Sequence, residues 1–387
     1  MKILVACVRG LACCGSHSPS RGFEFHLIKG GKGLSSEMYS LDDVLRVLEV
    51  EVSFKIPVGV LLGAVVAFFM VLVTISWLFE SSMDYSKQHV MITGGSSGIG
   101  LEAAKEYLKR GANVSLLARN QKKLDAAQAS LERFKVSSDQ KVLVESVDVG
   151  KLSDEEKVTT KVNALVKMLG PVHVLVNCAG TSIAGEFEAL QGVDFARMLD
   201  VNVMGSVLPT RAAIKSMKEA KAGGRVIFVA SQVAQVAIHG YTAYAASKWA
   251  LRGLAEALQM EVKPHGILVS VVYPPDTDTP GYEEEMKSKP ALTKALSDSG
   301  SLFQPSDVAR DLVTYSTKGY SHISTGLDGW LLKMLHPGMG PMNHLWETAQ
   351  PIIFAPLARI ISLFYVVSWD WMCAAEAKNE AAKQKDD

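Results

Sequence analysis

The sequence predicts an α/β fold: a doubly wound parallel sheet, preceded by a transmembrane helix and followed by an apolar, membrane-associated C-terminal extension. Three observations support this fold class. Short apolar runs alternate with longer amphipathic segments between residues 84 and 326, a glycine-rich turn follows the first run, and an uncharged stretch precedes both. Strands that alternate with helices normally pair in parallel, with helices on both faces of the sheet. We therefore expect one large domain at 84–326 and an extension at 327–387.

The uncharged stretch is Ile56–Phe79, which contains 24 residues. As a helix it would be about 36 Å long, and a hydrocarbon core needs only about 20 residues. A core helix of this length would normally keep a polar stripe, so a transmembrane helix is the better interpretation. Residues 1–55 form an N-terminal extension to which we assign no role. Lys and Arg residues around the span weakly favour a cytosolic N-terminus.

The elements between residues 84 and 326 follow from local sequence patterns. Each predicted strand is a short apolar run, as expected for strands that are buried on both faces. Helices are predicted where apolar residues recur with helical spacing; the first ends at Gly111, and the third opens at Ser153 with acidic residues in its first turn. The predicted strands are 88–93, 113–118, 141–147, 172–177, 224–230 and 267–273, with a seventh considered near 322–325. The predicted helices are 100–111, 120–134, 153–170, 194–220 and 242–262.

The composition excludes several classes of protein. The 387 residues carry a net charge of +0, whereas a nucleic-acid-binding protein normally shows a basic excess or a basic face. With 48% hydrophobic residues, the chain is too apolar to be disordered. Five cysteines at irregular spacing, without a CxxC pair, predict neither a disulfide framework nor a metal site. They suit a reducing compartment, which favours placing residues 84–387 in the cytosol, against the charge count around the span.

The turn after the first predicted strand, Thr93–Gly100, reads TGGSSGIG. Such a turn lets the backbone approach a pyrophosphate, and the helix N-terminus behind it supplies free N–H groups and positive potential. The same letters also match G-x-S-x-G, the nucleophile elbow of hydrolases, which would make Ser96 a nucleophile. That alternative needs a histidine late in the chain, and His322, His336 and His344 are available.

The end of the second predicted strand indicates which nicotinamide cofactor is used. A fold that binds NAD normally has Asp or Glu about 20 residues past the glycines, to bond the ribose hydroxyls. Here the position holds Arg119, and no acid is present. A guanidinium makes paired hydrogen bonds to a phosphate, so Arg119 favours the 2′-phosphate of NADPH, with Lys123 as a second candidate. Asp148, at the end of the third strand, is placed to bond adenine.

Tyr244 and Lys248 are four residues apart on a predicted helix and therefore share one face. We expect the Lys248 ammonium to lower the pKa of the phenol from its usual value of about 10. A phenol tuned in this way can protonate a carbonyl oxygen while hydride reaches the carbon. Ser231 ends a strand thirteen residues before Tyr244 and is placed to polarise the same carbonyl. Asn202, in the long predicted helix, is placed to hold a water against Lys248.

These motifs resemble, in type and order, those of the short-chain dehydrogenase/reductase family, over roughly 240 of the 387 residues. Thr93–Gly100 matches the family's TGxxxGxG turn, and Asn177–Gly180 matches NNAG with Cys178 in place of the second Asn. This order of motifs argues against a hydrolase. The resemblance implies a Rossmann-like fold without a metal, and a catalytic tetrad of Asn202, Ser231, Tyr244 and Lys248. It implies that NADPH contacts Gly94, Ser96, Ser97, Gly98, Gly100, Arg119, Lys123, Asp148, Asn177, Tyr244, Lys248 and Thr279.

Within this family, the stretches 92–100, 116–124, 240–264 and 273–281 resemble membrane-bound reductases of a long-chain lipid ketone. That resemblance implies an enzyme of the endoplasmic-reticulum membrane whose active site faces the cytosol. Very-long-chain 3-ketoacyl-CoA reductases, hydroxysteroid dehydrogenases and a catalytically silent NADP-binding scaffold are the alternatives. The sequence departs from the family at Pro274-Pro275-Asp276, where Pro-Gly is usual.

The helix–strand alternation stops after Gly326. Residues 327–373 hold four of the six tryptophans. The apolar segment Pro351–Trp371 contains Arg359, and its longest uncharged part, Ile360–Trp369, is too short to cross a bilayer. We expect a membrane-interface or substrate-access element here. A dimer contact, and thus a homo-oligomer, or a helix packed on the domain are the alternatives. The segment after Thr279, at 283–300, is expected to form a mobile lid over the substrate.

Overall fold

The computed structural model describes residues 83–297, 302–335, 340 and 343–386, together with a few isolated positions between 59 and 74. By compactness the chain divides into Met1–Phe68 and Phe69–Asp387, and the fold belongs to the second part. The N-terminal extension at 1–55 lies outside the described residues, and so does most of the predicted transmembrane segment at 56–79. Both therefore stay predictions.

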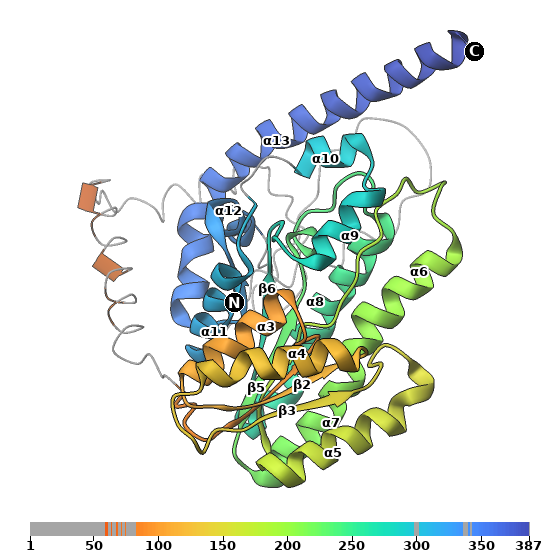
Figure 1. Cartoon of the computed structure of the whole chain (residues 1–387). Helices are drawn as coiled ribbons and strands as arrows, with labels where there is room; N and C mark the ends of the chain where they lie inside the picture. Colours follow the sequence, from red (N-terminus) through yellow and green to blue (C-terminus); the bar gives the residue numbers. More distant parts are fainter. Residues whose placement is uncertain are drawn as a thin grey trace, which may run out of the picture. The chain divides into compact units, whose positions relative to one another are not determined.

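The described residues contain a seven-stranded sheet in the order β3-β2-β1-β4-β5-β6-β7, in which every pairing is parallel (Figure 1). The strands are β1 (His89–Thr93), β2 (Asn113–Ala118), β3 (Val142–Ser146), β4 (Val172–Asn177), β5 (Gly224–Val229), β6 (Ile267–Tyr273) and β7 (His322–Ser324). The predicted parallel α/β fold is confirmed, including its seventh strand. The chain reverses its winding between β1 and β4, and in open α/β sheets ligands bind in the crevice outside that point.

Helices cover both faces of the sheet. On one face, α3 (Gly98–Lys109), α4 (Gln121–Leu131) and α11 (Pro305–Thr317) bury residues such as Leu108, Leu124 and Leu312. On the other face, α5 (Glu155–Leu169), α7 (Gly205–Ala220) and α8 (Thr242–Val262) bury residues such as Leu165 and Leu251. Two apolar layers thus hold the sheet between them and fix the carboxyl ends of its strands.

The helical stretch predicted as one element at 194–220 is interrupted. Helix α6 (Gly192–Met198) passes into a π-helical turn at Leu199–Met204, and α7 then continues to Ala220. A π turn inserts an extra residue into the helix and is often found at functional sites. Here it carries Asn202, one of the predicted catalytic residues, whose side chain is fully buried.

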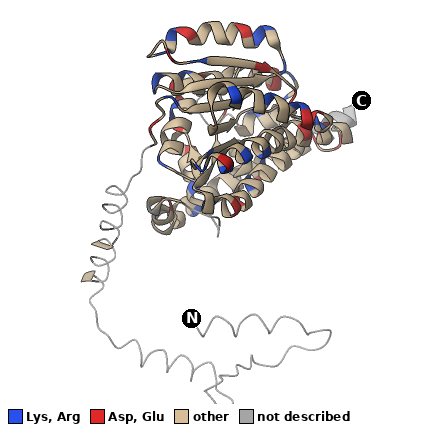
Figure 2. Ribbon diagram, turned by 90° about the horizontal axis from the view of Figure 1, so that it is seen from below, with Lys and Arg blue, Asp and Glu red and all other residues tan. Residues whose placement is uncertain are grey.

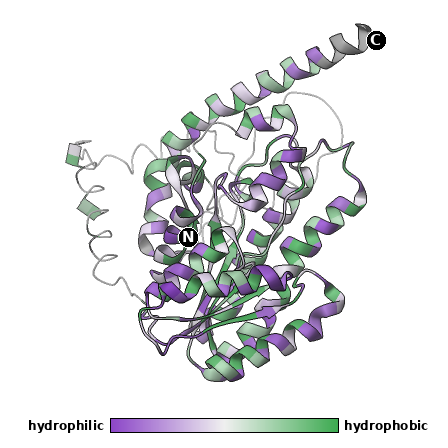
Figure 3. Ribbon diagram, viewed as in Figure 1, coloured by the Kyte–Doolittle hydropathy of each residue, from purple (hydrophilic) through white to green (hydrophobic). Residues whose placement is uncertain are grey.

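The segment predicted as a lid forms two helices, α9 (Pro280–Ser288) and α10 (Ala291–Ser297). After β7 the chain forms α12 (Gly326–Leu335) and a long helix, α13 (Leu345–Asp386). Hydrophobic residues recur along α13 (Figure 3). Within it, Trp346–Asn379 has a mean hydropathy of 1.8 in its most apolar part, which is only 6% buried. By length and composition this helix could cross a membrane, which differs from the expectation drawn from the uncharged part Ile360–Trp369 alone, because the apolar stretch continues past Arg359.

Charged side chains of both signs are interspersed over the helices of the described fold (Figure 2). Many of them pair on one helix, such as Lys109 with Glu106 and Arg310 with Asp307. The expectation, drawn from composition, that the protein does not bind nucleic acid stays a prediction.

Candidate active site

A cavity of about 630 Å³ lies outside the carboxyl ends of the central strands, where the topology predicts a ligand. The β1–α3 turn, the ends of β2 and β3, the start of α8 and the loop after β6 all contribute to its wall. Of the residues predicted from sequence, the cavity is lined by Gly94, Ser96, Ser97, Gly98, Arg119, Lys123, Asp148, Ser231, Tyr244, Lys248 and Thr279.

The β1–α3 turn has the backbone geometry that a pyrophosphate requires. Gly94 has a φ of +67°, and a Cβ there would lie 2.8 Å from the backbone of Ala179. A Cβ on Gly100 would lie 2.6 Å from the Gly94 carbonyl oxygen, so Gly100 permits the close packing of the helix on the turn although it does not line the cavity. The N-terminus of α3 thus faces open space, and its free N–H groups suit a pyrophosphate.

Thr93 and Thr279 close this turn from two sides. The Thr93 hydroxyl accepts hydrogen bonds from the backbone N–H groups of Cys178 and Ala179, each at 3.2 Å, which ties β1 to the end of β4. Thr279 caps α9 by accepting a hydrogen bond from Tyr282 N at 3.1 Å, and it packs against Gly98. The sequence-based role of Thr279 as a cofactor contact is therefore sterically consistent.

The far end of the cavity carries positive charge. Arg119 follows β2 and is exposed, and Lys123 is on the first turn of α4, whose N-cap is Asn120. Asp148 follows β3, where it accepts a hydrogen bond from Gly150 N at 3.1 Å. No carboxylate occupies the end of β2, and Arg119 and Lys123 are two cationic side chains on this part of the cavity wall.

Tyr244 and Ser231 both line the cavity, and their side chains are hydrogen-bonded to each other. Ser231 follows β5 and begins a short helical turn, with its hydroxyl accepting a hydrogen bond from Val233 N at 3.2 Å. Burial raises the pKa of Tyr244 well above its usual value, the Glu285 carboxylate raises it further, and the hydrogen bond with Ser231 partly offsets both. The phenol is therefore protonated at neutral pH and can act as a proton donor next to a second hydroxyl.

Lys248 corrects one expectation. Its side chain is 5% exposed, its Nζ donates to the Val229 carbonyl at 3.0 Å, and it lies 5.7 Å from the centre of the Tyr244 ring. The expectation that Lys248 lowers the pKa of Tyr244 is wrong, because desolvation of the phenol dominates and raises its pKa. Burial also lowers the pKa of Lys248 itself, to about 8.

Asn202 lies beside Lys248 but outside the cavity lining. A Cβ on Gly180 would lie 3.2 Å from Asn202 Oδ1 and 3.4 Å from Lys248 Nζ, so both side chains flank this glycine. Asn202 accepts a hydrogen bond from Thr181 N at 2.9 Å and donates to Thr181 O at 3.0 Å and Ser247 Oγ at 2.8 Å. It thus fixes the loop after β4 against α8, which carries Tyr244 and Lys248.

Two residues that the sequence analysis considered for the site, Asn177 and His322, do not line the cavity. The Asn177 side chain is buried and donates to Thr210 Oγ1 on α7 at 2.8 Å, so it points away from the cavity lining. His322, needed by the hydrolase alternative, is buried on β7, bonded to the Tyr273 hydroxyl at 3.0 Å, and does not line the cavity with Ser96. No Ser–His pair forms there among the described residues.

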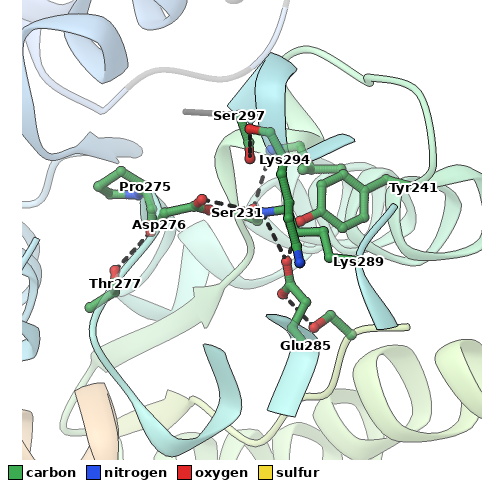
Figure 4. Close-up of polar contacts among 11 residues, drawn as sticks. Ser231, Tyr241, Pro275, Asp276, Thr277, Glu285, Lys289, Lys294 and Ser297 are labelled. Atoms are coloured by element: carbon green, nitrogen blue, oxygen red, sulfur yellow. Dashed lines mark hydrogen bonds and ion pairs between the residues drawn. The ribbon is translucent and has the colours of Figure 1, made fainter. Parts of the chain in front are cut away.

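The structure also brings together polar residues that the sequence analysis did not assign. Asp276, Glu285, Lys289 and Tyr241 form a charged group beside Ser231 (Figure 4). Asp276 is in the loop after β6, Glu285 is on α9 and Lys289 follows that helix, whereas Tyr241 immediately precedes α8. The sequence analysis noted one feature of this group, the departure from the family's usual Pro-Gly at Pro274-Pro275-Asp276.

A second cavity, of about 340 Å³, adjoins the first. Its apolar wall includes Leu331, Leu332 and Leu335 of α12 and Ile361 and Val366 of α13. Both cavities are lined by Ser231, Val233, Tyr241, Pro274, Pro275 and Asp276. An apolar chain in the second cavity can therefore present a polar group to Ser231 and Tyr244.

The doubly wound sheet, the glycine turn at its crevice and the Ser–Tyr–Lys arrangement facing that crevice define a nicotinamide-dependent oxidoreductase. The short chain dehydrogenase family model matches residues 88–290, and the chain belongs to this family. The cofactor site fits a nicotinamide dinucleotide, because the turn leaves room for the pyrophosphate and the cavity extends from Arg119 to Tyr244.

The chain is similar to particular members of the family over most of its length. It is 47% identical over 307 residues to the 3-dehydrosphinganine reductase of Danio rerio, a match that covers 79% of this chain and 92% of that protein. It is 44% identical over 309 residues to the 3-ketodihydrosphingosine reductase of Bos taurus, covering 80% and 92%. Among solved structures, levodione reductase superposes with a TM-score of 0.56 at 23% identity, covering 62% of this chain and 96% of that one, which supports the fold alone.

Proposed function

We propose that the protein reduces the C3 ketone of 3-ketosphinganine to sphinganine, a step of sphingolipid synthesis, with NADPH as the reductant. One observation supports this most directly. The cavity that holds Ser231 and Tyr244 adjoins an apolar cavity, and the two share wall residues that include Ser231 and Tyr241. A long-chain ketone fits this arrangement, and the two relatives described above are named for reduction of this ketone.

The chemistry assigns a role to each group of the tetrad. When bound, the reduced nicotinamide supplies the hydride for the carbonyl carbon. Ser231 orients the carbonyl oxygen through its hydroxyl, and Tyr244 protonates that oxygen as it gains negative charge. The raised pKa of Tyr244 keeps the proton on the phenol until the oxyanion develops. The Lys248 ammonium is the nearby group that can return a proton to Tyr244, and Asn202, which flanks Gly180 together with Lys248, holds the loop after β4 in place.

The preference for NADPH rests on charge at the end of β2. Arg119 and Lys123 line this part of the cavity, and no acidic residue follows the strand. A guanidinium bonds a 2′-phosphate in a paired geometry, whereas a fold selective for NAD places a carboxylate there to bond the ribose hydroxyls. Asp148, after β3, is placed for the adenine end of the cofactor.

Membrane attachment follows from the substrate. A long alkyl chain resists transfer into water by about 0.8 kcal/mol per CH₂, so the enzyme benefits from working at the bilayer. Exposed apolar side chains on α13, among them Ile352, Leu357 and Phe364, form a surface suited to lipid, and other residues of the same helix line the apolar cavity. We place the enzyme in the endoplasmic-reticulum membrane, held also by Ile56–Phe79, with residues 84–387 facing the cytosol.

The test measures NADPH consumption by the detergent-solubilised full chain given 3-ketosphinganine, with sphinganine identified by mass spectrometry. Tyr244→Phe is the matched control, because it removes only the phenol hydroxyl. The variant should keep cofactor binding within a few-fold and lose turnover by at least about a hundredfold, the range that a proton donor contributes.

A ketoacyl-CoA and a ketosteroid are offered in parallel. Reduction of either in preference to 3-ketosphinganine would contradict the substrate assignment and leave the reaction class intact. Binding of NADPH without reduction of any ketone would identify a silent scaffold. Near-normal turnover by Tyr244→Phe would contradict the mechanism.

A further inference from the structure

Lys289, which follows α9, carries an ammonium enclosed by the protein. Its side chain has no exposed surface, and its Nζ lies 3.3 Å from Asp276 Oδ2 and 3.5 Å from Glu285 Oε1. Figure 4 shows the three side chains converging beside Ser231 and Tyr241. A lysine buried to this degree is stable only when it is paired, so the two carboxylates account for its position.

Aromatic rings complete the surroundings of this ammonium. Lys289 Nζ lies 5.4 Å from the centre of the Tyr241 ring and 5.5 Å from that of the Tyr282 ring. Ring faces attract cations, most strongly where water is excluded. Two carboxylates and two aromatic rings thus form an ammonium-binding site, and it binds the Lys289 ammonium. The four residues are Asp276, Glu285, Tyr241 and Tyr282.

The charge within the group is not balanced. Two carboxylates face one ammonium. Glu285 is also fully engaged, since it accepts hydrogen bonds from the Tyr241 hydroxyl and, at 2.5 Å, from Ser182 Oγ. Its side chain is 11% exposed, whereas that of Asp276 is 36% exposed, and Asp276 lines both cavities. The excess negative charge is therefore presented to the ligand space by Asp276.

Asp276 is held close to the groups that bind the ketone. The Pro274 carbonyl, two residues before it, accepts a hydrogen bond from Gln232 N at 3.1 Å, and Gln232 follows Ser231 directly. Asp276 and Ser231 both line the wall that the two cavities share. A ketone bonded to Ser231, with its alkyl chain in the apolar cavity, therefore has its neighbouring carbon near Asp276.

Gln235, which lines the apolar cavity, gives a second, independent sign of a polar ligand group near the shared wall. Both polar atoms of its amide are shielded from solvent and have no hydrogen-bond partner in the described protein. An unpaired buried amide is unfavourable by about 1–3 kcal/mol, so a ligand that carries a polar group next to its alkyl chain would be stabilised here. A simple hydrocarbon has no polar group to bond the Gln235 amide and would not be stabilised in this way.

We propose that Asp276 is a specificity-determining residue that binds an ammonium group on the carbon next to the reacting ketone. This inference rests on the proposed function and assigns the residue that recognises the 2-amino group of its substrate. Glu285 and Lys289 hold Asp276 in place. A cationic substrate neutralises the excess charge of the group, whereas a neutral ketone leaves it uncompensated.

The experiment compares two ketones of equal chain length, 3-ketosphinganine and its analogue without the 2-amino group, in the detergent-solubilised full chain with NADPH. For the wild type, kcat/KM should be at least about tenfold higher for the amino ketone. Asp276→Asn, which keeps the shape and removes the charge, should bring the two values within about threefold of each other by lowering only that of the amino ketone.

Glu283→Gln is the matched control, because it removes the same charge from an exposed position on α9 and should leave the ratio unchanged. Equal kcat/KM values in the wild type, or an Asp276→Asn variant that loses both activities equally, would overturn the inference while the proposed function stands. A wild type that reduces neither ketone would overturn both.

Inhibition of the wild type keeps the inference testable should Asp276→Asn not fold. A saturated long-chain primary amine should compete with 3-ketosphinganine at least about tenfold more strongly than the alcohol of the same length. Equal inhibition by the amine and the alcohol would overturn the role of Asp276.

Discussion

Replacing Lys248 with Met should make the cofactor-free protein more stable at neutral pH while abolishing its activity. Lys248 is 5% exposed, and burial lowers its pKa from 10.5 to about 8, an effect only partly offset by Cys178. At about 1.4 kcal/mol per pH unit, this difference corresponds to about 3 kcal/mol of lost stability. Loss of the hydrogen bond to the Val229 carbonyl offsets about 1 kcal/mol. Lys248→Met should therefore gain about 1–3 kcal/mol.

The sign of the pH dependence separates this explanation from a simple packing effect. Below pH 8 both the folded and the unfolded wild type carry the proton, so the whole penalty is present. Between about pH 8 and 10.5 the unfolded chain binds more protons than the folded one, so the stability of the wild type rises with pH. The advantage of Lys248→Met should shrink over the same range.

Thermal unfolding of both proteins in one detergent, without cofactor, at pH 7 and pH 10 measures this difference. For a domain of this size, 1 kcal/mol moves Tm by roughly 2–4 °C. A variant less stable than the wild type at pH 7 would refute the reasoning. So would a gap between the two proteins that stays constant from pH 7 to pH 10.

Other expected outcomes concern the cofactor, the alkyl chain, a buried thiol and topology. Arg119→Asp should shift preference from NADPH toward NADH at least about tenfold in kcat/KM, because a carboxylate repels the 2′-phosphate; equal use of both cofactors by the wild type would contradict this. Ala358→Trp should narrow the apolar cavity and lower kcat/KM for a long-chain ketone but not for a short one. Burial raises the pKa of Cys178 to about 11, so maleimide labelling of its peptide should accelerate as pH approaches 11. Protease added to sealed microsomes should digest 84–387, and protection would place that segment in the lumen.

The strands and the cofactor turn could be predicted because their signals are local. An apolar run such as 267–273 is long enough to identify a buried strand, and Thr93–Gly100 contains its whole motif within eight residues. The tetrad could be assembled from separate strand ends and helix faces because the topology of a parallel sheet brings those ends together. The strands, the glycine-rich turn and the residues at the strand ends could be predicted because each depends on spacing along the sequence.

What could not be predicted depends on packing between distant segments. The direction of the Asn177 side chain is set by Thr210 on α7, and the pKa of Tyr244 is raised by burial and by the Glu285 carboxylate on α9. The ion pair between Lys289 and Asp276 forms only because α9 brings Lys289 next to the loop after β6. The π turn at 199–204 leaves no trace in hydrophobic spacing, because it changes only one turn of an otherwise helical pattern.

Helix α13 shapes part of the apolar cavity but carries none of the reacting groups. Ser231 and Tyr244 are fixed by the central sheet and by α8, whereas much of the apolar cavity is shaped by a helix that follows the last strand. Substitutions on α13, at positions such as Ala358 and Ile361, can change the depth of the cavity without disturbing a strand or the reacting groups. Chain-length preference can therefore drift between lineages, or be engineered, while the reaction itself is preserved.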